Sequence, residues 1–108
     1  MNAVERLWRA LQGRDWDGAR AQFHQHATVE LPHTGERLDV EEYVTRQRLL
    51  GDAAVAVIEI SAAADDRPVA VHATVRVHGV TWHRAGFYVL HQARIARATE
   101  VWAPAVRD

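Results

Sequence analysis

The sequence predicts an α+β domain in which helices come first and a mainly antiparallel sheet follows. Up to about residue 50, apolar residues recur at helical spacing, and from residue 53 onward they alternate with a period of two. Short polar turns separate the alternating segments, as in a meander of strands. With 108 residues the chain can build one hydrophobic core, so we expect a single domain over residues 1–108.

Three amphipathic helices are expected before residue 52. Gly13 suits the end of the first, and Asp15 can cap the second. Asp39, followed three residues later by a glutamate, resembles a capping box and opens the third, which Gly51 ends. Their apolar stripes are Val4, Leu7, Trp8 and Leu11, then Trp16, Ala19 and Phe23, then Val40, Tyr43, Val44 and Gln47.

A short strand is expected between the second and third helices, and four longer strands after the third. Residues 27–31 alternate and stop at Pro32, and residues 33–36 have the composition of a turn. The later strands are expected at residues 53–61, 69–78, 80–90 and 95–103, with turns at residues 65–68 and at Gly79.

Composition and charge exclude several classes of function. The net charge is −1 and the basic residues are scattered singly, which argues against nucleic acid or an anionic membrane as partner. Without cysteine there can be no disulfide framework, thiol nucleophile or cysteine metal site. No apolar run resembles a signal peptide or reaches the length of a membrane span, so we expect a cytoplasmic location.

The strand at 69–78 has one uniformly apolar face, made of valines and an alanine, and one mixed face. Alternation alone predicts that the valines face the core and the mixed face meets water. The next strand, 80–90, carries aromatic residues on both faces, which favours a sheet covered on both sides. Because three helices can cover only one face, this pattern also predicts a homodimer through the other. The mixed face consists of Ala70, His72, Thr74, Arg76 and His78.

Three segments together resemble the nuclear transport factor 2-like (NTF2-like) superfamily, and most closely its SnoaL-like, polyketide cyclase-like group. The segment FHQHATVELP at 23–32 resembles the entry to its first strand, and TGER at 34–37, leading into VEEY, the approach to its third helix. FYVL at 87–90 and TEVW at 99–102 resemble its closing hairpin. The resemblance implies a cone-shaped, cystatin-like fold: a strongly curved sheet around three N-terminal helices, an internal pocket, and a dimer through the convex face.

The resemblance also implies which strand faces line the pocket. It places the even positions of 69–78 and the odd positions of 80–90 inward, together with Glu100 and Trp102, and leaves the valine-rich face for the dimer. The predicted catalytic set is Glu100, His72, His83 and Arg76. The predicted ligand-binding residues are Trp16, Phe23, His33, Tyr43, Thr74, Phe87 and Trp102.

The role of Glu100 has two alternatives. Burial beside Trp102 would raise the pKa of its carboxyl and suit it to donate or accept a proton, whereas an ion pair with Arg76 would lower that pKa and make it structural. His72 and His83 could shuttle protons near neutral pH, or could be satisfied polar groups in a wet cavity.

Other chemistries find little support in the sequence. By the same resemblance, Leu31 and Ala85 stand where ketosteroid isomerases have their two acids. Limonene-type epoxide hydrolases have two aspartates in their pattern, and the matching positions in this chain do not reproduce them, since they are Thr74, Arg76 and Glu100. Seven histidines lack the spacing of a metal site, and we expect neither metal nor cofactor.

We therefore expect a domain that binds a small apolar or aromatic molecule in an internal pocket. Cofactor-free acid–base chemistry, of cyclase, isomerase or dehydratase type, is one use of such a pocket. The alternatives are a non-catalytic ligand-binding domain and a dimerisation module whose pocket is filled by its own side chains. Fold alone does not distinguish them.

Overall fold

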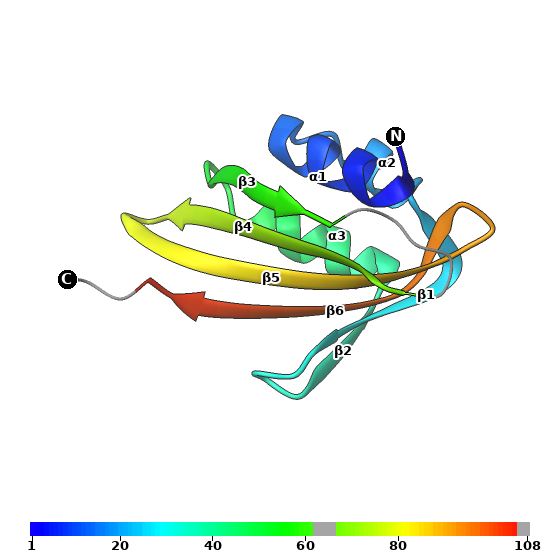
Figure 1. Ribbon diagram of the computed structural model, residues 1–108. Helices are drawn as coiled ribbons and strands as arrows, with labels where there is room; N and C mark the ends of the chain where they lie inside the picture. The colour runs from blue at the N-terminus through cyan, green and yellow to red at the C-terminus, as the bar shows by residue number, and fades with distance from the viewer. Residues whose placement is uncertain (62–66, 106–108) are drawn as a thin grey trace.

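A computed structural model describes residues 1–61 and 67–105 and confirms the α+β class. One six-stranded sheet, in the order β2-β1-β6-β5-β4-β3, is antiparallel throughout except for the parallel pair β1–β6 (Figure 1). The elements in chain order are α1 (Ala3–Gly13), α2 (Trp16–Arg20), β1 (Phe23–Leu31), β2 (Glu36–Asp39), α3 (Val40–Leu49), β3 (Ala54–Ile60), β4 (Val69–Val77), β5 (Val80–His91) and β6 (Arg94–Pro104).

Local sequence signals explain where the helices begin. The capping box predicted at Asp39 is present, since its side chain accepts from the Glu42 amide while the Glu42 side chain accepts from the Asp39 amide. Asn2 opens α1 with the same arrangement. Asp15 caps α2 by accepting from the Gly18 amide, as predicted.

Two predicted boundaries differ from the structure. The second helix ends at Arg20, and Phe23 begins β1 instead of belonging to that helix. Residues 36–39, expected to lead from a turn into the third helix, form β2 and pair with residues 28–31 of β1. Within the turn predicted at 65–68, residues 65 and 66 lie outside the described residues.

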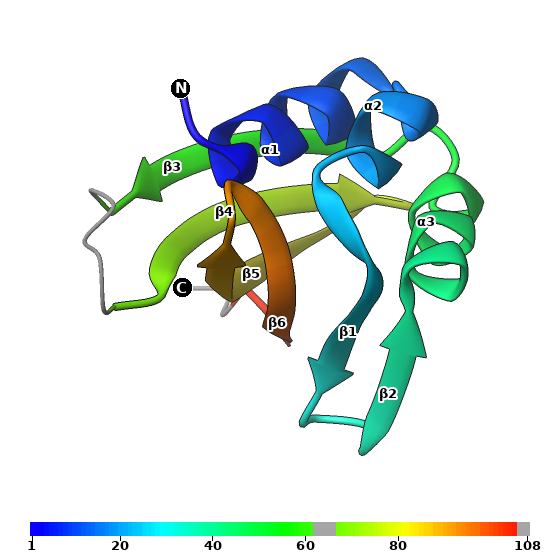
Figure 2. The same cartoon turned by 90° about the vertical axis from the view of Figure 1, so that its right-hand side faces the viewer.

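The helices pack on the inner face of a bent sheet. α1 contacts β3 and β6, α3 contacts β1 and β2, and Figure 2 shows how β4 curves beneath the helices. The core between these layers includes Leu7, Trp8 and Tyr43 from the helices and Val71 and Tyr88 from the sheet. No helix in the described residues is long and apolar enough to cross a membrane.

The strand faces predicted from the resemblance are wrong for β4 and β5. Val69, Val71, Ala73 and Val75 are buried against the helices within a single copy of the chain. Register places Ala73 opposite Arg84, so the even positions of β5 share this inner face. The simpler expectation from alternation, valines toward the core, holds. Five predicted site residues therefore lie on the outer face: His72, Thr74, Arg76, His83 and Phe87.

The same finding overturns the predicted dimer surface. The valine-rich face is already covered by the chain's own helices, so it is not available to a second copy. A homodimer stays a prediction, but it would have to use a different surface.

Candidate functional site

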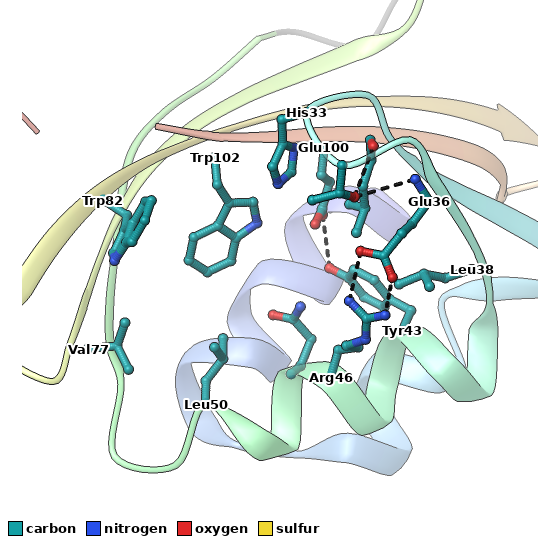
Figure 3. Close-up of a pocket in the computed structure, with 13 residues that line it drawn as sticks. His33, Glu36, Leu38, Tyr43, Arg46, Leu50, Val77, Trp82, Glu100 and Trp102 are labelled. Carbon is teal, nitrogen blue, oxygen red and sulfur yellow. Dashed lines mark hydrogen bonds and ion pairs between the residues drawn. The ribbon is translucent and has the colours of Figure 1, made fainter. Parts of the chain in front are cut away.

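A cavity of about 370 Å³ lies where the end of the sheet, the β1–β2 hairpin and α3 meet. This volume lies within the usual range for small-molecule sites. Its walls are mainly apolar, and Figure 3 shows Trp82, Trp102, Leu50 and Leu38 around the space. The full lining consists of Leu31, His33, Thr34, Glu36, Leu38, Tyr43, Arg46, Gln47, Leu50, Val77, Trp82, Glu100 and Trp102.

One face of α3 forms the wall opposite the sheet. Tyr43, Arg46 and Gln47 of α3, with its C-cap residue Leu50, follow each other at the i, i+3, i+4, i+7 spacing of a single helix face. The strands contribute from the inner face alone: in β5–β6 register Arg84 lies opposite Trp102, and Gly86 opposite Glu100. The helical spacing on α3 and the alternation of side chains in β5 and β6 thus bring the polar residues of these elements together.

A buried ion pair joins Glu100, which lines the inner end of the cavity, to Arg84 behind it. Arg84 Nη2 donates to Glu100 Oε1 at 2.6 Å, and both side chains are at most 1% exposed. Burial alone would lower the pKa of Arg84, but the charge of Glu100 and its hydrogen bond outweigh this and raise it. Arg84 is therefore a permanent cation, neutralised by the carboxylate beside it.

Two tyrosines complete the hydrogen bonding of Glu100. Tyr43 and Tyr88 both donate to Oε2, at 2.9 and 2.5 Å. Burial first, and then the carboxylate and the hydrogen bonds to it, raise the pKa of both phenols, although Arg84 acts in the opposite direction. Both phenols thus stay protonated as donors. Trp8 supports the set by donating from Nε1 to the Tyr88 hydroxyl at 3.2 Å.

Aromatic rings enclose the guanidinium of Arg84. Its Cζ lies 4.6 Å from the ring centroid of Trp8 and 4.9 Å from that of Trp102, distances typical of cation–π contacts. The absence of a side chain at Gly86 is required here, because an added Cβ would overlap the Tyr88 ring. Within the described residues, Arg84 Nε is the one buried side-chain donor that lacks a partner.

The outer end of the cavity is polar and open to solvent. Arg46 forms an ion pair with Glu36, and this contact lowers the pKa of the Glu36 carboxyl. His33 is exposed and lines the same end (Figure 3). The cavity therefore runs from a charged rim to an apolar interior whose inner end contains Glu100 and Tyr43.

Four of the predicted site residues line this cavity: His33, Tyr43, Glu100 and Trp102. The structure does not place Trp16 or Phe23 in its wall. Phe23 is buried in the core, where its ring meets that of Tyr43 edge to face at 5.4 Å. Arg76, the predicted partner of Glu100, instead donates to Thr81 on the outer face at 3.3 Å.

The outer-face histidines form a pair of their own. His72 Nε2 and His83 Nδ1 lie 3.0 Å apart, and both side chains are exposed. They are remote from Glu100, because they project from the opposite face of the sheet. Among the described residues no cluster of three or more His, Cys, Asp or Glu could hold a metal ion.

Sequence reasoning missed Arg84, Gln47 and Tyr88 as members of the site. The sequence does contain a signal for Arg84. Among residues 80–90, the even positions carry two aromatic residues, one glycine and Arg84, whereas the odd positions carry one aromatic residue. The signal is that Arg84 lies on the more aromatic of the two faces. Arg84 can lie inward because the carboxylate of Glu100 neutralises its charge.

The geometry also revises two comparisons with known active sites. Ala85, matched by resemblance to an isomerase acid, lies on the outer face, and its inward neighbours are Arg84 and Gly86. In β5 the inward residues read Arg-x-Gly, with Glu100 opposite the glycine, so this face does not reproduce the two aspartates of limonene-type epoxide hydrolases either.

No family model matches the sequence, and no match was found among curated proteins. Solved structures, however, match most of the chain. An NTF2-like protein of unknown function from Burkholderia xenovorans has a TM-score of 0.86 at 16% identity, covering 98% of this chain and 84% of that one. A candidate ketosteroid isomerase from Kribbella flavida has a TM-score of 0.84 at 22% identity, covering 98% and 78%.

A third structure, IdmH, a candidate polyketide cyclase from Streptomyces antibioticus, has a TM-score of 0.79 at 17% identity, covering 93% of this chain and 88% of that one. The three descriptions name different activities or none, so the similarity identifies the fold and not the chemistry. The chain has the NTF2-like fold, as the sequence resemblance predicted.

Proposed function

We propose that this chain is a SnoaL-like domain that binds a small, largely apolar molecule with a flat ring system in the cavity beside α3. The observation that carries this proposal is an apolar cavity of about 370 Å³, lined by two tryptophans and three leucines, with few polar groups at its inner end. Such a combination is typical of ligand sites, in which apolar walls provide affinity and a few polar atoms provide orientation.

The state of Glu100 favours binding over catalysis. A general base must be free to accept a proton, but the two oxygens of Glu100 already accept three hydrogen bonds, one of them from Arg84. The tyrosines beside it remain protonated because their pKa values are raised. The Arg84–Glu100 ion pair and the phenols of the two tyrosines are therefore better suited to stabilising the cavity wall than to transferring protons.

Native mass spectrometry of freshly purified protein tests the proposal directly. We expect a small bound molecule, released under denaturing conditions, and the same spectrum reports the oligomeric state. In Leu50→Trp the larger side chain would fill the cavity, and we expect at least a tenfold loss of bound molecule.

Leu49→Trp is the matched control, since Leu49 is the adjacent residue, is 74% exposed and does not line the cavity. Its occupancy should equal that of the parent protein. Undiminished occupancy in a folded Leu50→Trp variant would show that the molecule binds elsewhere and would contradict the proposal.

A second candidate function is cofactor-free acid–base chemistry on the bound molecule. One observation favours it: His33, a residue type that commonly serves as a general acid or base, lines the cavity at its open end. Its test is turnover of the co-purifying molecule by His33→Gln. Loss of turnover with unchanged occupancy would support an enzyme, and unchanged turnover would exclude His33 as the acid or base.

A further inference from the structure

Strand register brings two histidines together on the outer face of the sheet. His72 and His83 are 11 positions apart in the sequence, but His72 lies opposite Ala85 and His83 opposite Thr74, so the two are diagonal neighbours on β4 and β5. His72 Nε2 and His83 Nδ1 are 3.0 Å apart, and the ring centroids are 5.2 Å apart. The spacing of histidines along the chain could not predict this pair, because only the pairing of the strands creates it.

The separation of the two nitrogens matches what two ligands of one metal ion require. Imidazole nitrogens bind Zn²⁺ at about 2.0–2.1 Å, and Cu²⁺ and Ni²⁺ also favour imidazole. At this bond length, angles of about 90–110° at the metal place two nitrogens about 2.9–3.4 Å apart. The 3.0 Å between His72 and His83 lies within that range. Small rotations of the two rings would therefore direct both lone pairs at one ion.

The hydrogen bond between the rings does not prevent both nitrogens from binding a metal. A neutral imidazole has one N–H and one lone pair, so one of the facing nitrogens donates its proton to the other. Both become ligands when that proton moves to the second nitrogen of its own ring. Because both side chains are exposed, water can accept the relocated N–H. The change costs no buried hydrogen bond.

A second pair of histidines lacks this arrangement. The rings of His24 and His91 also lie close, with centroids 5.6 Å apart. However, Nε2 of His24 contacts the backbone carbonyl oxygen of His91 and not its ring. A carbonyl oxygen can only accept, so this nitrogen carries the proton and has no lone pair for a metal. Among the described residues, facing ring nitrogens therefore occur only in the pair on β4 and β5.

The charged neighbours of the pair oppose each other. In β3–β4 register Glu59 lies opposite His72, and its side chain is exposed. Arg76 is a diagonal neighbour of His83 on β4, and its guanidinium donates to Thr81 at 3.3 Å. The carboxylate attracts a cation and the guanidinium repels one, so the affinity for a cation must come from the two imidazoles.

We propose that His72 and His83 form a two-ligand site for a late first-row divalent cation, the class that includes Ni²⁺, Cu²⁺ and Zn²⁺. Water completes the coordination, because no third His, Cys, Asp or Glu joins the pair in the described part of the chain. Two ligands held on one sheet bind an ion more tightly than either alone, since the second bond forms at a high effective concentration. The site lies on the face of the sheet opposite to Glu100 and is independent of the proposed binding function.

Isothermal titration calorimetry of the full chain, without an affinity tag, tests the site with nickel chloride. We expect Ni²⁺ to bind with 1:1 stoichiometry, and Mg²⁺, which prefers oxygen ligands, not to bind. His72→Gln and His83→Gln should each lower the Ni²⁺ affinity by at least about 10-fold, because a single imidazole remains. Glu59→Gln removes only an exposed charge and should lower it by about 2- to 5-fold.

The double variant His26→Gln/His78→Asn is the matched control. It also removes two exposed imidazoles, but neither belongs to the pair. Asparagine is chosen at residue 78 because the backbone there has a φ of 51°, which asparagine tolerates. Its Ni²⁺ affinity should equal that of the parent protein, whereas His72→Gln/His83→Gln should abolish the 1:1 binding. Circular dichroism checks that every variant is folded.

The comparison of the two double variants decides the proposal. Loss of Ni²⁺ binding confined to the variants of His72 and His83 would support it. Equal losses in both double variants would show that Ni²⁺ binds exposed imidazoles in general, and would overturn it. An affinity unchanged in His72→Gln/His83→Gln, or no Ni²⁺ binding to the parent protein, would overturn it as well.

Discussion

Both faces of strands β4 to β6 carry ionisable side chains, but these side chains lie in opposite environments. The inner face holds Arg84 and Glu100, which are at most 1% exposed and share a connected set of hydrogen bonds with two tyrosines and Gln47. The outer face holds His72 and His83, which are exposed and contact mainly each other. The presence of polar residues on a strand therefore does not predict where the site lies in this chain. The two faces differ because the helices cover only the inner one.

The largest expected effect comes from breaking the inner ion pair. Glu100→Gln keeps the shape of the side chain but leaves Arg84 as a buried charge without a counterion, and we expect a loss of about 3–5 kcal/mol in the free energy of unfolding. Urea denaturation followed by circular dichroism measures it. Glu59→Gln, the same change at an exposed position on β3, is the control and should cost less than about 0.5 kcal/mol. Equal losses of unfolding free energy in the two variants would show that the buried ion pair contributes no more to stability than an exposed glutamate does.

An intermediate effect is expected at alkaline pH and also belongs to the inner face. The sequence contains no lysine and no cysteine, and its two tyrosines are Tyr43 and Tyr88, both bound to Glu100. Their pKa values are raised in the folded state, so above pH of about 10 the unfolded chain loses protons that the folded chain keeps. The stabilisation is complete below that pH and should decline above it by up to about 1.4 kcal/mol per pH unit for each tyrosine.

Tyrosinate absorbance provides the measurement for this second prediction. In the folded protein it should stay low until unfolding begins and then rise for both residues together. Tyr88→Phe should halve the dependence of unfolding free energy on pH. Two phenols that ionise freely near pH 10 in the folded protein would contradict the burial of the inner face.

The smallest effect is expected on the outer face. His72→Ala removes only an exposed contact with His83 and should change the free energy of unfolding by less than about 0.5 kcal/mol. Val71→Ala, one residue earlier but on the inner face, deletes buried methyl groups and should cost about 1–3 kcal/mol. A cost for His72→Ala that rises with protein concentration would show instead that a second copy covers the outer face.

Helix starts and fold class could be predicted because they depend on neighbours in sequence. The capping box at Asp39 and the cap at Asp15 are local hydrogen bonds between residues three apart. The strands after residue 53 were predicted from their period, which reports the pleat of the backbone. β2 was not, because four residues are too few to display a period.

The faces of β4 and β5 that lie inward could not be predicted from local sequence patterns in this way. A shift of one residue in register moves every side chain of a strand to the other face. The resemblance placed the even positions of β4 and the odd positions of β5 inward, and the structure places the opposite set there. Glu100 and Trp102 were correctly placed inward, since the closing strand was aligned on a motif that includes them. Arg76 was chosen as the partner of Glu100 only because β4 was placed the wrong way round.

The sequence by itself determined the order of elements, the NTF2-like fold and the presence of a carboxylate and tryptophan at the end of the last strand. The order of elements follows from local periodicity and caps, and the fold follows from the resemblance of three segments to the NTF2-like superfamily. Only the tertiary structure decided that Arg84 is the partner of Glu100 and that Arg84 also donates to Gln47. Those facts depend on register between strands and on where α3 packs, which are properties of residues 37 and 16 positions apart along the chain.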